Sequence, residues 1–111
     1  NKVRAGCTHV YYMLPFLLEL PEWISRRAII EALKAEGFPL EGGYVRPLYH
    51  NPAFGQLGTG SCPVAEELHN KTLMTFSNCE WSPTDYQIAM FAEAVYKVDK
   101  LLVRDGERVN A

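Results

Sequence analysis

The sequence has no long hydrophobic run, no excess of basic residues and no closely spaced pair of cysteines. Its 111 residues include 11 Lys or Arg and 13 Asp or Glu, a formal charge of −2. This balance argues against nucleic acid or an anionic membrane as the main partner. The longest apolar stretch, VYYMLPFLLEL, is shorter than the roughly 20 residues that cross a bilayer, and it contains Pro15. We therefore expect no membrane-spanning segment.

The cysteines also limit the class of protein. Cys7, Cys62 and Cys79 are odd in number and far apart, so they do not suggest a disulfide framework. Their spacing favours a reducing, cytoplasmic setting. No signal peptide is recognisable, and the Asn-Lys-Thr sequon at Asn70 therefore carries little weight. Because the chain begins at Asn1 rather than Met, we expect a processed or excised piece.

Composition and periodicity predict one α+β domain over residues 1–111. The chain is 48% hydrophobic and 22% charged, as in ordinary globular proteins. The pattern predicts the following elements in order: a strand at 8–20, a helix at 25–38, an extended segment at 39–49, a loop at 51–61, a helix from 62, a strand at 73–77 and a helix from 82 to about 106. This order is typical of a small antiparallel sheet covered by helices.

The predicted helices carry start, stop and core signals. Ser25 is the expected N-cap of the first, and Gly37 follows its end, where a left-handed residue is favoured. Pro63 suits the first position of the second helix, with Ser82, Pro83 and Asp85 at the start of the third. The apolar residues at helical spacing are a core stripe of Ile29, Ile30 and Leu33 in the first helix, an apolar side of Val64, Ala65 and Leu68 in the second, and an apolar face of Ile88, Phe91, Val95, Val98 and Leu102 in the third.

Three possible sites lack the spacing that their chemistry needs. A metal site would draw on scattered residues, namely Cys7, His9, Cys62, His69 and Cys79, whereas zinc ligands usually come in close pairs. Cys62 at a helix start is a candidate nucleophile with His50 or His69 as base, but nothing fixes the pair in space. The GQLGTGS stretch at 55–61 lacks the Gly-Lys-Ser/Thr ending of a P-loop and fits a surface loop better.

Two acidic residues and one aromatic segment complete the candidates. Glu66 and Glu67 are adjacent on a helix, so they cannot face each other as an acid/base pair and are expected to be solvated charges. The segment GGYVRPLYHNPAF at 42–54 carries Tyr44, Arg46 and Tyr49. These side chains could bind a phosphate, carboxylate or sugar. They could instead belong to an edge strand whose rings cover the core, and composition alone favours this second alternative.

Five segments in succession resemble a known family. They are HVYYMLPFLL, SRRAIIEALKAEGFPLEGGY, RPLYHNPAF, CPVAEELHNKTL and SPTDYQIAMFAEAVYKV. Together, over residues 7–103, they resemble the C-terminal part of the DegT/DnrJ/StrS family of pyridoxal-phosphate-dependent aminotransferases, and 104–111 would be a tail. The resemblance implies the small C-terminal domain of fold-type-I, aspartate-aminotransferase-like enzymes. Relatives often carry a proline near Thr75 and Phe76, which this chain lacks.

The resemblance also implies a function for a longer parent protein. The parent would transfer an amino group from glutamate or glutamine to a keto-sugar or cyclitol ketone, using pyridoxal 5′-phosphate. It would be a homodimer in which this chain joins its own large domain. The family's Schiff-base lysine has no counterpart here, so this chain alone should bind no cofactor and be inactive, with no catalytic, cofactor-binding or metal-binding residue of its own. The alternative is a stand-alone, non-catalytic binding or regulatory domain.

The same resemblance assigns a substrate side to the aromatic segment. Tyr44 and Tyr49 fall where relatives place His or aromatic residues near the substrate. Arg46 is a weaker candidate for contact with an anionic or hydroxylated substrate, and His50 is weaker still. The sugar, the amino donor and the pathway do not follow from the sequence.

Overall fold

The chain forms a small three-stranded sheet with helices, as predicted for an α+β fold. The computed structural model describes residues 2–10, 12–54, 62–76 and 82–106. Strands β1 (Leu14–Leu17), β2 (Glu41–Gly42) and β3 (Leu73–Phe76) pair antiparallel in the order β1-β3-β2. The helices are α1 (Arg26–Ala35), α2 (Pro63–Glu67) and α3 (Asp85–Val98). The predicted antiparallel sheet is thus confirmed.

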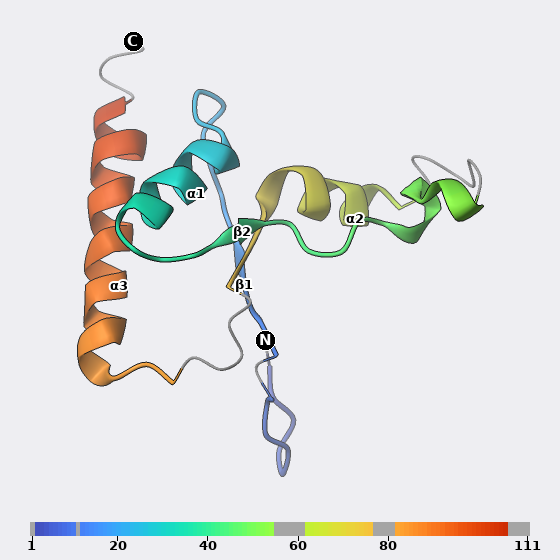
Figure 1. Cartoon of the computed structure of the whole chain (residues 1–111), viewed down its shortest axis with the longest axis horizontal. Helices are drawn as coiled ribbons and strands as arrows, with labels where there is room; N and C mark the ends of the chain where they lie inside the picture. Colours follow the sequence, from blue (N-terminus) through green and yellow to red (C-terminus); the bar gives the residue numbers. More distant parts are fainter. Residues whose placement is uncertain (1, 11, 55–61, 77–81, 107–111) are drawn as a thin grey trace.

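The helices lie on opposite sides of the strands (Figure 1). Helices α1 and α3 lie on one side, with α1 between the strands and α3. Helix α2 and the segment that follows β2 project on the other side. No helix in the described ranges is both long and apolar enough to span a membrane.

The first strand is much shorter than the predicted strand at 8–20. Its four residues pair with β3 from Leu14 opposite Phe76 to Leu17 opposite Leu73. One more hydrogen bond continues the ladder, from Leu18 N to Thr72 O at 2.9 Å. The predicted strand was too long because its run of apolar, β-favouring residues is longer than the partner strand β3. A ladder of hydrogen bonds ends where the partner strand ends.

Helix α1 confirms the predicted start, end and core stripe. The Ser25 side chain accepts a hydrogen bond from Ala28 N at 3.3 Å, which satisfies one of the free N–H groups of the first turn. Gly37 has φ +97°, a conformation that favours glycine. The three predicted core residues of this helix, Ile29, Ile30 and Leu33, are all buried.

Helix α3 begins two residues later than the predicted Ser82 start. Its N-cap is Thr84, whose Oγ1 accepts from Gln87 N at 3.3 Å while Gln87 Oε1 accepts from Thr84 N at 2.9 Å. This reciprocal pair is a capping box. A π-helical segment, Asp99–Arg104, continues the helix. The predicted stripe is only partly buried: Val98 is in the core, whereas Ile88 is 51% and Val95 40% exposed.

The hydrophobic core lies between α1, α3 and the sheet. Its buried apolar residues are Ile29, Ile30, Leu33, Leu40, Met74, Phe76, Ala94 and Val98. Phe38, which follows the end of α1, packs edge-on against Phe91 of α3, with ring centroids 4.9 Å apart. Thr75 is also buried, and its Oγ1 donates to Gly43 O at 3.0 Å. The core therefore includes the start of the segment that follows β2.

Candidate functional site

Residues 44–54 of the aromatic segment form a chain of turns, although the sequence predicted an extended stretch over 44–49. Strand β2 ends at Gly42, and Gly43 has φ +75°. Two 3₁₀ turns follow, Leu48–His50 and Pro52–Phe54. Pro47 has φ −48° and no N–H to give to a ladder, so it caps the first turn instead of continuing a strand. The predicted edge strand over 44–49 is therefore wrong.

Gly43 sits where the segment leaves the sheet, and its backbone is fixed on both sides. Its N–H donates to Leu73 O at 2.7 Å, and its carbonyl accepts from Thr75 Oγ1. A Cβ at this position would lie 3.0 Å from both the carbonyl oxygen and the Nδ1 of His69. Glycine is therefore required here both for its φ angle and for the space that it leaves.

Replacing Gly43 with Ala should lower the free energy of unfolding by about 2 kcal/mol. Roughly 1 to 2 kcal/mol comes from the left-handed backbone, and the close contact with His69 adds to it. Gly6 is a matched control, since it has φ +78° but no atom within 4 Å of an added Cβ. Chemical denaturation of both variants measures the difference. Equal losses would contradict the role assigned to the His69 contact.

Tyr49 is anchored to α2 by one hydrogen bond, and His50 packs against the Tyr49 ring. The Tyr49 hydroxyl donates to Glu66 Oε1 at 2.9 Å, and the His50 ring meets the Tyr49 ring edge-on at 4.7 Å between centroids. Partial burial, this hydrogen bond and the Glu66 charge raise the pKa of Tyr49 to about 12, and the nearby Cys62 thiol adds to the effect. Glu66 is thus not the solvated charge that the sequence predicted, whereas Glu67 makes an exposed ion pair with Lys71 at 3.0 Å.

Ultraviolet titration of tyrosine ionisation should show one phenol near pH 12. The Tyr49→Phe variant should lose this component, and the Tyr86→Phe variant should keep it because Tyr86 is exposed on α3. In Glu66→Gln the pKa of Tyr49 should fall toward its ordinary value of about 10. Because the folded pKa is raised, the stability linked to Tyr49 is present below pH 10 and is lost as the pH rises through 12. An unchanged Tyr49 titration in Glu66→Gln would contradict the assigned cause.

Tyr44 and Arg46 have different surroundings from Tyr49. Tyr44 is 47% exposed and hydrogen-bonds the Tyr12 hydroxyl. This bond, the nearby charge of ionised Tyr12 and slight desolvation raise the pKa of Tyr44. Arg46 is exposed and makes no hydrogen bond or ion pair with the described residues. The four predicted site residues therefore do not form one cluster: Tyr49 and His50 contact each other, Tyr44 contacts Tyr12, and Arg46 is exposed. None of the four lines any of the three cavities that the structure shows.

Arg26 is a structural residue that the sequence analysis missed. Its Nη1 donates to the carbonyls of His69 at 2.9 Å and Leu73 at 2.8 Å, with a longer contact to Leu68 at 3.4 Å. Burial lowers the pKa of Arg26. One signal was present in the sequence: Arg lies in the first turn of α1, where the helix dipole disfavours a positive charge. Arg26 ties α1 to the π-helical turn Leu68–Thr72 that ends α2.

The second predicted helix contributes little to the core. Pro63 occupies the first turn, as expected, but α2 ends at Glu67 and has no buried residue. Val64, on its predicted apolar side, is mostly exposed. This apolar side is not buried because α2 lies on the side of the strands away from α1 and α3, beside the segment that follows β2 (Figure 1).

The cysteine and metal candidates find no support in the described part of the chain. Cys7 and Cys62 are exposed. No cluster of three or more His, Cys, Asp or Glu there is placed to hold a metal ion. Cys79 and the glycine-rich stretch at 55–61 lie outside the described residues.

Comparison with known proteins gave no match. No family model, no curated protein and no solved structure matches the chain.

Proposed function

We propose that the chain is the small C-terminal domain of a pyridoxal-phosphate-dependent aminotransferase of the DegT/DnrJ/StrS family, which aminates a keto-sugar or cyclitol ketone. The succession of five sequence segments supports the family. The α+β order and the three-stranded antiparallel sheet are compatible with such a domain. Glutamate or glutamine is the proposed amino donor of the parent protein.

The observation that carries the proposal is the aromatic arm at 43–54. It projects from the sheet, away from α1 and α3 (Figure 1). Tyr49 is held against α2 through Glu66, while Tyr44 and Arg46 remain exposed. The arm is positioned by hydrogen bonds, and Tyr44, Arg46, Tyr49 and His50 line none of the three cavities described above. Such an arm suits one wall of a site completed by another domain. Tyr44, Arg46, Tyr49 and His50 are the proposed substrate-side residues of that wall.

The surroundings of three lysines support placing pyridoxal phosphate outside this chain. Three of the lysines are in ion pairs with exposed or half-exposed carboxylates: Lys34 with Glu41 at 3.2 Å, Lys71 with Glu67 and Lys97 with Glu36 at 2.6 Å. None of these amines lies in an enclosed site. The proposal therefore assigns cofactor binding to the large domain of the parent protein, and no chemical step to this chain.

The coding sequence upstream of Asn1 tests the proposal directly. We expect it to encode a preceding domain with a cofactor-binding lysine. A start codon immediately before Asn1 would contradict the proposal. Titration of the isolated chain with pyridoxal phosphate is an independent test. We expect no stoichiometric adduct on a single lysine, and mass spectrometry after borohydride reduction detects one if it forms.

The second candidate function is a non-catalytic binding domain. It is favoured by one observation, an apolar groove beside α3 that no described segment covers. This candidate requires a partner but no second domain in the same polypeptide. A complete reading frame that contains only this chain would favour it over the aminotransferase.

A further inference from the structure

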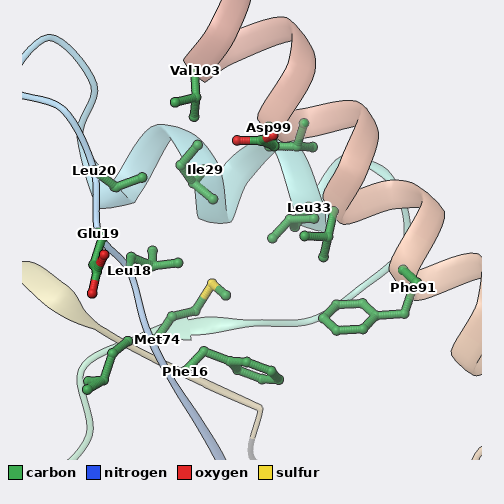
Figure 2. Close-up of a pocket in the computed structure, with 14 residues that line it drawn as sticks. Phe16, Leu18, Glu19, Leu20, Ile29, Leu33, Met74, Phe91, Asp99 and Val103 are labelled. Atoms are coloured by element: carbon green, nitrogen blue, oxygen red, sulfur yellow. The ribbon is translucent and has the colours of Figure 1, made fainter.

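Two cavities share the segment that follows β1, and they differ in the charge of their walls. Leu18 and Leu20 line both of them. The larger cavity, about 550 Å³, lies between β1 and α3 and is lined mostly by apolar side chains (Figure 2). The second, about 420 Å³, lies at the start of α1 and includes Arg26 and Arg27 in its lining. We call the second one the arginine cavity; its volume is typical of small-molecule sites.

Three segments of the chain form the arginine cavity. The residues between β1 and α1 contribute an apolar wall of Leu18, Leu20 and Ile24, which also pack against the core. The first turn of α1 contributes the two arginines. The end of α2 and the π-helical turn after it contribute polar groups, namely Glu67, Asn70, Lys71 and Thr72. The cavity therefore combines an apolar wall with a few polar groups, the arrangement typical of small-molecule sites.

Arg26 carries a partly buried charge that has no counter-ion in the described part of the chain. Its hydrogen-bond acceptors are backbone carbonyls, and all of them bind Nη1. No described carboxylate forms an ion pair with it, and the N–H groups on Nε and Nη2 have no acceptor among the described residues. Burial lowers the pKa of Arg26, and no neighbouring negative charge offsets this effect. A charge in this state is stabilised when an anion binds beside it.

The other charges of the lining leave this positive charge uncompensated. Arg27 is exposed and has no ion pair or hydrogen bond from its side chain to any described residue. The first turn of α1 contains no acidic residue. Lys71 is neutralised by Glu67 at 3.0 Å. The remaining carboxylate of the lining, Glu22, makes no ion pair with a described residue and cannot balance two arginines. The cavity therefore favours a negatively charged ligand.

We propose that the arginine cavity binds a small molecule through a phosphate or carboxylate group, held by the guanidinium groups of Arg26 and Arg27. The unpaired N–H groups of a guanidinium form a planar fork that matches either oxyanion. The uncharged part of the molecule lies on the apolar wall of the cavity. The proposal does not depend on the aminotransferase assignment, since none of the four proposed substrate-side residues lines this cavity.

A bound anion also stabilises the contact between α1 and the turn that ends α2. Arg26 makes this contact through the carbonyls of His69 and Leu73, and Asn70 of the same turn lines the cavity. The anion neutralises the charge that the contact leaves partly buried. Because it binds the folded chain alone, it should raise the Tm by about 5 °C at ten times its dissociation constant.

Three probes that share a phenyl ring test the charge requirement on the whole chain: phenyl phosphate, benzoate and benzyl alcohol. Two-dimensional NMR of the backbone amides measures their binding. We expect at least one of the two anions to shift the amides of Arg27 and Asn70, with a dissociation constant of roughly 1 mM. The anion that binds more tightly identifies the oxyanion. The proposal is overturned if neither anion shifts these amides, or if the uncharged benzyl alcohol binds there equally well.

Substitutions inside and outside the lining locate the site. Arg27→Gln should weaken binding of the anion about tenfold, because it removes a charge-assisted hydrogen bond. Arg4→Gln is the matched control, since Arg4 is exposed and outside the lining, and it should leave binding unchanged. Glu22→Gln should tighten binding, because it removes a carboxylate from the lining. Circular dichroism checks that each variant keeps the fold. Equal weakening by Arg27→Gln and Arg4→Gln, or weaker binding in Glu22→Gln, overturns the proposal.

Discussion

The Leu40→Ala variant is expected to lose about 3 kcal/mol of folding free energy. Leu40 follows the turn after α1 and is 0% exposed, within the cluster that joins α1 to the sheet. Removing its branched end leaves a cavity that the other residues of this closely packed cluster cannot fill by relaxing. The core is small, so this loss is a large fraction of the 5 to 15 kcal/mol typical of a domain.

Urea denaturation and thermal unfolding measure this loss, with a fall in Tm of roughly 10 °C expected. Leu48→Ala is the matched control, because Leu48 is 68% exposed in the first 3₁₀ turn and should change stability by no more than about 0.5 kcal/mol. If both variants lost the same amount, Leu40 would not be the core residue that the fold requires.

The Arg26→Met variant is expected to lose about 2 to 3 kcal/mol. The change keeps the apolar stem of the side chain but removes the donor that serves the His69 and Leu73 carbonyls. Hydrogen bonds from a charged donor contribute more than neutral ones, and the partly buried acceptors are left without that donor. The part of Arg26 that is exposed limits the loss, since water can replace some of the contact.

Arg27→Met is the control for helix charge and propensity, because Arg27 is adjacent and exposed. It should change stability by less than about 0.5 kcal/mol. Hydrogen exchange adds a local readout: Arg26→Met should speed exchange of the Gly43 amide, which donates to the same Leu73 carbonyl. Unchanged exchange at Gly43, together with equal stability of the two variants, would contradict the anchoring role of Arg26.

Local signals in the sequence predicted α1 and the sheet class well. Ser25 and Gly37 act within a few residues of the helix ends, so their effects can be read without knowing the fold. The stripe of α1 is buried because the sheet lies directly against it. The strand at 73–77 was also placed correctly, as β3 lies at Leu73–Phe76.

Features that depend on distant partners could not be predicted in the same way. The acceptors of Arg26 lie more than forty positions away along the chain, and Glu66 meets Tyr49 across seventeen. The length of β1 is set by β3, not by its own apolar run. The face of α3 was predicted correctly as apolar, but the described residues bury only part of it, since Val98 is in the core and Ile88 is 51% exposed.

The sequence predicted which residues belong to the candidate site, but not how they are arranged in space. Tyr44, Arg46, Tyr49 and His50 were singled out for their chemistry, and the structure places them on one arm with separate contacts. The sequence could not predict the need for glycine at position 43. This need comes partly from the close approach of His69, which lies in the π-helical turn Leu68–Thr72.

The most direct test of the proposed function is the activity of the protein encoded by the complete reading frame. The purified protein should contain pyridoxal phosphate, and its visible absorbance should change when glutamate or glutamine is added. A keto-sugar or cyclitol ketone should reverse that change and be recovered as the amine. A full-length protein that holds no pyridoxal phosphate, or whose absorbance none of these donors alters, would contradict the assignment of this chain to an aminotransferase.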